Sequence, residues 1–210
     1  DYQLINIHYP GYANSEMLNN NFSIEDLADM LIEVTRKLNV EQMHLVGWSL
    51  GGLVAQVIAE KEPKIVKSLS LLGTGTISMF DDDYYNEHVH VKEAILEEAL
   101  LAGESSKKVM NNESLLIATF NTNVLMHYAK IIKHFDHKKF RKIACDVQVI
   151  NGAKDKVLLR KYAQAMVNNF DNVTYKELEE AGHFLALTHP QEVNELLNTF
   201  IGERDLEKVS

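Results

Sequence analysis

Cysteine, proline and tryptophan are scarce in this sequence of 210 residues. The single cysteine, Cys145, excludes an internal disulfide and a cysteine-rich metal site, and it is typical of a reducing compartment. No apolar stretch approaches the roughly 18 residues that a membrane span needs. With 3 proline and 10 glycine residues, the chain is neither collagen-like nor broadly disordered. We therefore expect a cytoplasmic globular protein without a membrane span.

Positively charged residues are also fewer than negatively charged ones. Lysine and arginine together number 21, against 30 aspartate and glutamate residues, which gives a formal net charge of −9. A surface this acidic repels a phosphate backbone, so we expect no nucleic acid partner. At 46% hydrophobic residues, the chain still has enough apolar surface to bury one sizeable core. The composition favours one globular domain with room for a small insertion.

The apolar residues that are present alternate between strand-like and helix-like spacing. Short apolar runs bounded by turn residues predict strands, and apolar residues at three- and four-residue spacing predict amphipathic helices. In chain order we expect a strand over 2–7, a helix over 24–38, a strand over 43–46, a helix over 50–60 and a strand over 66–72. Further on we expect a strand over 147–151, a helix over 158–170, a strand over 173–178 and a helix over 191–201. This alternation is typical of a parallel α/β sheet.

The alternation stops between residues 77 and 142, where only helical patterns recur. Helices are expected there over 89–102, 113–120 and 124–135. A helical block spliced between two α/β segments is most simply a cap over a site. We therefore expect an α/β core made of residues 1–76 and 143–210, with a helical cap or lid over 77–142.

The strongest chemical signal is the pattern Gly-Xaa-Ser-Xaa-Gly at residues 47–51, between a predicted strand and a predicted helix. Small residues at Gly47 and Gly51 let strand and helix approach closely enough for a sharp turn, which exposes the hydroxyl of Ser49. The backbone N–H of Leu50 would then point at an oxyanion formed on a carbonyl group that Ser49 attacks. A serine nucleophile needs a base, and the base needs an acid that orients it.

Three motifs together resemble the α/β-hydrolase superfamily, over nearly the whole chain. They are Gly47-Trp48-Ser49-Leu50-Gly51-Gly52, Asn151-Gly152-Ala153-Lys154-Asp155 and Ala181-Gly182-His183-Phe184. The stretch from Val46 to Ala55 is similar to carboxylesterases that cleave the methyl ester of pimeloyl carrier protein. The resemblance implies the α/β-hydrolase fold, with a mostly parallel sheet and an inserted helical cap. It also implies a Ser–His–Asp triad, an acyl-enzyme intermediate and no cofactor.

In that superfamily the nucleophile, the acid and the histidine follow one another along the chain, each just after a strand. Ser49, Asp155 and His183 occupy these places, so they are the expected catalytic residues. The aspartates at 81–83 follow the preceding predicted strand and are the alternative acid. We interpret them as a solvated charge run. Trp48, beside the nucleophile, either lines the substrate pocket or fills the core.

The beginning of the chain does not match the whole superfamily pattern. One predicted helix separates residues 2–8 from the elbow strand, so this segment corresponds to the fourth strand of the superfamily's sheet. The first three strands, and the His-Gly loop that carries the second oxyanion N–H, would then precede residue 1. Since buried strands do not leave backbone groups unpaired, we expect a missing N-terminal segment or a complementing chain. Without the oxyanion loop, the chain is expected to be a poor catalyst.

Histidines and lysines cluster within the expected cap. The pairs His88/His90 and His134/His137 lack a carboxylate or cysteine frame of metal-ligand spacing, so we expect no metal. The segment Lys130–Lys142 holds five lysines and one arginine. This basic run is either a solvated helix face or a docking site for an acidic acyl carrier protein or a CoA phosphate.

The expected function follows from the nucleophile. We expect a serine hydrolase that cleaves a small acyl substrate, either a carboxylic ester or a thioester, through an acyl-enzyme on Ser49. One alternative is a carbon–carbon bond hydrolase on the same triad, which a screen of diketones against esters would separate. Another is a non-catalytic ligand-binding protein, which would bind tightly without a burst of acyl-enzyme.

Overall fold

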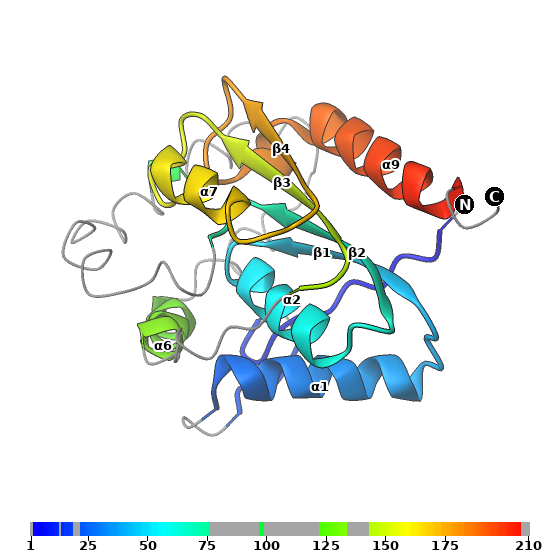
Figure 1. Ribbon diagram of the computed structural model, residues 1–210. Coiled ribbons are helices and arrows are strands. Elements are labelled where there is room, and N and C mark those ends of the chain that lie inside the picture. The colour runs from blue at the N-terminus through cyan, green and yellow to red at the C-terminus, as the bar shows by residue number, and fades with distance from the viewer. Residues whose placement is uncertain are drawn as a thin grey trace.

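The computed structural model describes residues 2–12, 14–18, 22–75, 97–98, 122–133 and 143–206. Its helices and strands alternate along the chain (Figure 1). They are α1 (Ile24–Lys37), β1 (Met43–Trp48), α2 (Leu50–Lys61), β2 (Val66–Leu72), α6 (Thr122–Lys133), β3 (Asp146–Gly152), α7 (Arg160–Val167), β4 (Val173–Leu178), α8 (Leu185–Thr188) and α9 (Pro190–Leu206). The strands predicted after residue 40 are all present, and β2 and β4 have the predicted bounds.

The four strands form one parallel sheet in the order β1-β2-β3-β4, so each strand lies beside the one before it in the chain. Leu45 is in register with Leu69, and Leu71 with Val149. Parallel strands all end at the same edge of a sheet, and ligands bind beyond that edge in open α/β sheets. The residues that follow β1, β3 and β4 therefore lie close together.

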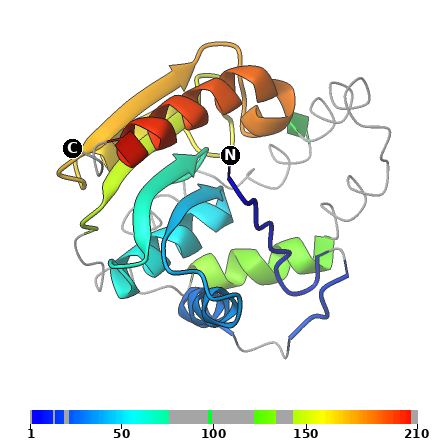
Figure 2. The same cartoon turned by 90° about the vertical axis from the view of Figure 1, so that its right-hand side faces the viewer.

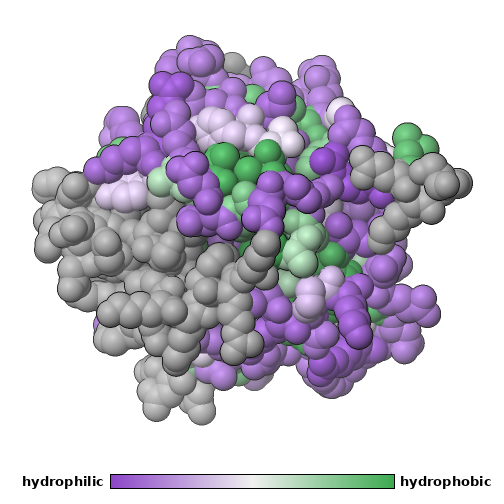
Figure 3. Space-filling view, viewed as in Figure 1, coloured by the Kyte–Doolittle hydropathy of each residue, from purple (hydrophilic) through white to green (hydrophobic). Residues whose placement is uncertain are grey.

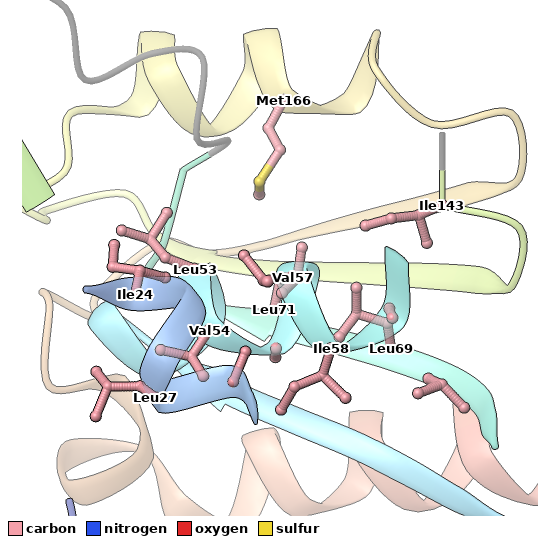
Figure 4. Close-up of a cluster of buried hydrophobic side chains, with 14 of the residues drawn as sticks. Ile24, Leu27, Leu53, Val54, Val57, Ile58, Leu69, Leu71, Ile143 and Met166 are labelled. Carbon is pink, nitrogen blue, oxygen red and sulfur yellow. The ribbon is translucent and has the colours of Figure 1, made fainter. Parts of the chain in front are cut away.

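Helices cover both faces of the sheet (Figures 1 and 2). α2 and α7 pack on one face, with α1 against α2, and α9 packs on the other. Successive residues of a strand point to opposite faces, so Leu71 and Leu72 belong to different hydrophobic clusters. The larger cluster joins Leu71 to Met166 of α7 (Figure 4), and the smaller one joins Leu72 and Ile150 to Val193 of α9. Because both faces are covered, polar strand residues such as Ser68, Ser70 and Gln148 are buried as well.

Local sequence sets the beginning of α1. The Ser23 hydroxyl oxygen accepts the backbone N–H of Asp26 at 3.1 Å, and the Asp26 carboxylate accepts the backbone N–H of Ser23 at 2.8 Å. This reciprocal capping box satisfies two helix-terminal donors. The hydrogen bond from the Ser23 backbone also holds the pKa of Asp26 below its ordinary value. Leu27 and Ile32 of this helix are buried in the larger cluster.

The predicted strand over residues 2–7 is wrong, because residues 2–9 form no strand. A strand exists only through hydrogen bonds to a neighbouring strand, and in the described part of the chain β1 pairs with β2 alone. The segment instead crosses the molecule as extended chain (dark blue in Figure 2), with Leu4 91% exposed. Tyr2 anchors its beginning, since its hydroxyl donates to Asp205 at 2.8 Å and its ring meets His44 edge-on.

The expected cap over 77–142 lies mostly outside the described residues. The helices expected over 89–102 and 113–120 fall there, apart from residues 97 and 98. α6 overlaps the helix expected over 124–135. The hydroxyl of Tyr128 on α6 donates to the Pro10 carbonyl at 2.8 Å, which attaches this helix to the N-terminal segment.

The described surface in Figure 3 is mostly hydrophilic, with hydrophobic residues gathered mainly in a strip near its middle. Among the helices that the structure describes, none is both long enough and apolar enough to cross a membrane.

Candidate active site

Ser49 lies in the turn between β1 and α2, with φ 52° and ψ −122°. Positive φ is costly for a residue with a side chain, so neighbouring groups must hold the turn in place. The Ser49 N–H donates to the Leu72 carbonyl at 3.0 Å, and the Thr74 hydroxyl donates to the Ser49 carbonyl at 2.7 Å. Both ends of the strained residue are therefore tied to β2 and the loop after it.

Close packing of β1 against α2 depends on Gly47. A methyl group on Gly47 would lie 2.5 Å from the Gly51 carbonyl oxygen and 2.7 Å from the Gly52 Cα atom. At Gly51, by contrast, an added methyl group would meet the Tyr9 hydroxyl at 3.5 Å among the described residues, which is an ordinary contact. The expected requirement for a small residue therefore applies to Gly47 rather than to Gly51.

The structure brings Ser49, His183 and Asp155 together in one hydrogen-bonded row. His183 Nε2 lies 2.9 Å from Ser49 Oγ, and His183 Nδ1 lies 2.9 Å from Asp155 Oδ2. An ionised carboxylate only accepts hydrogen bonds, so Nδ1 carries the proton and Nε2 is left to accept from the serine hydroxyl. Asp155 comes from the loop after β3 and His183 from the loop after β4, as the sequence predicts.

Each oxygen of Asp155 has a separate role. Oδ2 faces His183, while Oδ1 accepts the backbone N–H groups of Val157 at 2.8 Å and Leu158 at 2.7 Å. Asp155 is 4% exposed, and a buried carboxylate is stable only when it is hydrogen-bonded in this way. The two backbone bonds also explain why α7 begins at Arg160 rather than at the predicted residue 158, since the chain turns around this carboxylate first.

Leu50 begins α2 directly after Ser49. The first N–H groups of an α-helix have no acceptor within the helix, and its N-terminus carries partial positive charge. The Gly52 N–H turns back to the Ser49 carbonyl at 2.9 Å, which closes the first turn. The helix end at Leu50 can therefore stabilise negative charge that develops beside Ser49.

Trp48 supports the histidine loop. Its indole N–H donates to the His183 carbonyl at 2.8 Å, and its ring lies 5.0 Å from that of Phe184 between centroids. The side chain also packs against the smaller hydrophobic cluster. Of the two expected roles, pocket lining and core filling, the contacts described here correspond to packing and to holding His183.

Glu98 is the residue that sequence reasoning missed. It is one of the two residues that the structure describes between 75 and 122, it is 6% exposed, and its carboxylate accepts the backbone N–H groups of Lys156 and His183. Burial raises the pKa of Glu98 above its ordinary value, and the two N–H donors oppose that shift. Several glutamates share its charged helical pattern, so no local signal distinguishes it.

The remaining predicted residues lie outside the described chain. This applies to the alternative acid at 81–83 and to the histidine pairs His88/His90 and His134/His137. Among the described residues, no group of three or more histidine, cysteine, aspartate or glutamate side chains could hold a metal ion. Of the basic segment Lys130–Lys142, the described part includes Lys130, which is exposed on α6.

Comparison with known proteins agrees with this architecture. The family described as "alpha/beta hydrolase fold" matches residues 1–98, which include the elbow. A carboxylesterase structure from Nitrososphaera gargenis superposes with a TM-score of 0.74 at 16% identity, covering 95% of this chain and 79% of that one. An esterase from Exiguobacterium antarcticum gives a TM-score of 0.69 at 19% identity, covering 92% of this chain and 79% of that one. The chain has the α/β-hydrolase fold.

Sequence relatives extend the similarity to particular enzymes. The pimeloyl-[acyl-carrier protein] methyl ester esterase of Methylococcus capsulatus is 25% identical, covering 95% of this chain and 84% of that protein. The biotin biosynthesis bifunctional protein BioHC of Teredinibacter turnerae is 20% identical over 96% of this chain, which spans 40% of that longer protein. The resemblance to the α/β hydrolases, and to the pimeloyl ester esterases among them, is confirmed.

Proposed function

We propose that this protein is a serine hydrolase that cleaves carboxylic esters or thioesters through an acyl-enzyme on Ser49. The observation that carries the proposal is the row Ser49–His183–Asp155, with 2.9 Å at both links and the serine at a strained strand-to-helix turn. Esterases among the relatives and structural neighbours support it.

Acylation begins when Ser49 Oγ attacks the substrate carbonyl carbon. His183 Nε2 takes the hydroxyl proton, and Asp155 holds the imidazole in the required tautomer and stabilises the imidazolium. The carbonyl oxygen becomes an oxyanion that the Leu50 N–H stabilises at the N-terminus of α2. When the tetrahedral intermediate collapses, His183 returns the proton to the leaving alcohol or thiol, and the acyl group stays on Ser49.

Deacylation repeats the sequence with water as the nucleophile. His183 takes a proton from the water molecule, whose oxygen attacks the acyl carbonyl carbon. The second tetrahedral intermediate releases the carboxylic acid, and the proton on His183 returns to Ser49 Oγ. The free enzyme is thereby restored, and no step requires a cofactor.

Covalent labelling tests the nucleophile directly. A fluorophosphonate probe is expected to label the native protein at Ser49, because the probe phosphorus accepts attack by an activated serine. The variant Ser49→Ala should not be labelled, and mass spectrometry of the labelled peptide locates the site. Labelling of another serine, or equal labelling of both proteins, would refute the assignment.

The substrate's carrier is a finer proposal. We propose that the acyl group is presented on an acidic acyl carrier protein, as the names of the pimeloyl ester esterases state for those relatives. The basic segment Lys130–Lys142 is the proposed docking surface, because it concentrates positive charge within an acidic chain.

Salt should distinguish docking from chemistry. The Debye length falls from about 10 Å at 0.1 M to about 3 Å at 1 M ionic strength, so kcat/KM for a carrier-bound methyl ester is expected to fall across this range. A small neutral ester should be nearly unaffected. Charge reversal at Lys138, Lys139 and Lys142 should reproduce the contrast at low salt, whereas equal effects on both substrates would contradict docking.

A further inference from the structure

Glu98 is a buried carboxylate for which the reaction described above has no use. Its side chain reaches the two loops that carry the acid and the base. Oε1 accepts the N–H of Lys156, the residue after Asp155, at 2.6 Å, and Oε2 accepts the N–H of His183 itself. One carboxylate from the insert therefore connects the loop after β3 to the loop after β4.

The residue before His183 leaves room for this carboxylate because it has no side chain. A methyl group on Gly182, directly before His183, would lie 3.0 Å from the Glu98 Cδ atom and closer still to Oε2. Charge-assisted hydrogen bonds to backbone N–H groups are short and strong, and the one to His183 is buried. The position of the His183 backbone is thus tied on one side to Glu98 and on the other to Trp48.

We infer that Glu98 is a positioning residue of the candidate active site, which fixes the separation of the Asp155 and His183 loops and adds negative charge beside the imidazole. This inference rests on the proposed function. On this inference, a residue of the segment expected to form the cap helps to set the position of His183.

The charges around Glu98 make the second effect testable. Asp155 and His183 face it from the two loops, and the ammonium group of Lys156 pairs with Glu97 at 2.8 Å nearby. A second carboxylate near His183 favours the imidazolium that forms during catalysis. Removing its charge should therefore make the imidazolium lose its proton at lower pH.

The variant Glu98→Gln is the main test. An amide offers one acceptor oxygen and one donor group, so one of the two backbone N–H groups would face a donor. We expect kcat for a small ester to fall about 10- to 100-fold because the base is displaced, with KM changed by no more than about threefold. The acid limb of the kcat/KM profile should move to lower pH.

Glu97→Gln is the matched control. Glu97 is an exposed neighbour that contacts the same Lys156, through its ammonium group rather than its backbone. Exposed pairs of this kind contribute little, so kcat and the pH profile should stay at wild-type values. Wild-type kcat and pH profile in Glu98→Gln would overturn the inference.

A double-mutant cycle keeps the test valid if Glu98→Gln is unstable. Gly182→Ala should displace Glu98 and lower kcat to a similar extent, but it should have little further effect in the Glu98→Ala background. Additive losses in the cycle would contradict direct contact between the two residues.

NMR titration of the His183 imidazole measures the pH shift without turnover. If Ser49 is not labelled in the wild type, the proposed function fails, while this titration still tests Glu98.

Discussion

Replacing Asp155 with asparagine (Asp155→Asn) is expected to lower kcat for ester hydrolysis by about 10⁴-fold while the protein stays folded. A 10⁴-fold loss corresponds to about 5.5 kcal/mol of transition-state stabilisation. The measurement is steady-state kinetics on a small ester, with circular dichroism to confirm the fold. A variant that kept more than about a tenth of the activity would contradict the proposed role of Asp155.

The contacts of Asp155 explain why one atom should matter so much. The N–H groups of Val157 and Leu158 both point at Oδ1, and only an oxygen can accept them. The asparagine oxygen must therefore stay at that position, which turns its NH₂ group toward His183 Nδ1. That nitrogen then has to accept a hydrogen bond, so the ring proton moves to Nε2. A protonated Nε2 cannot take the proton of Ser49.

The chain offers a matched control at the other end of β1. Asp205 also contacts a histidine, since its Oδ1 lies 3.2 Å from His44 Nε2, and hydrogen bonding to Lys67 holds the pKa of Asp205 well below its ordinary value. Asp205→Asn should leave kcat unchanged. If the variant is less stable than the wild type, the difference should be largest above the ordinary pKa of aspartate. It should disappear as the pH falls through the lowered pKa of Asp205 in the folded protein.

Local pattern was sufficient to predict most of the sheet. β2 and β4 have the predicted bounds, because each holds apolar or aromatic residues at alternate positions and each is paired on at least one side. The same pattern over residues 2–7 predicted a strand that does not form. Apolar alternation indicates which face of a strand is buried, but it does not indicate whether another strand lies beside it to accept hydrogen bonds. Among the described residues, β1 pairs with β2 alone.

Of the residues at the site, some could be predicted from the sequence and others could not. Ser49, Asp155 and His183 could be found because each lies in a motif just after a strand, and parallel topology brings strand ends together. Glu98 and the indole contact of Trp48 could not be predicted. Both contacts join residues far apart in the sequence, 85 residues for Glu98 and His183 and 135 for Trp48 and His183.

The two glycines of the elbow motif are expected to respond oppositely to alanine. Gly47→Ala should lower the free energy of unfolding by about 1–3 kcal/mol, because the new methyl group meets backbone atoms that cannot move aside singly. Its contacts would be the Gly51 carbonyl oxygen at 2.5 Å and the Gly52 Cα atom at 2.7 Å. The strand would have to move away from α2, so labelling of Ser49 by a fluorophosphonate should also slow.

Gly51→Ala is the control within the same motif. Its methyl group would meet the Tyr9 hydroxyl at 3.5 Å, which is an ordinary contact, and alanine loses less backbone conformational freedom on folding than glycine does. Its free energy of unfolding should therefore equal or exceed that of the wild type, with Ser49 labelled at the wild-type rate. Urea denaturation of both variants measures the difference. If both variants lost the same free energy of unfolding, the motif would need glycine at both positions for its backbone conformation. The close approach of Gly47 to α2 would then not be what keeps the turn sharp.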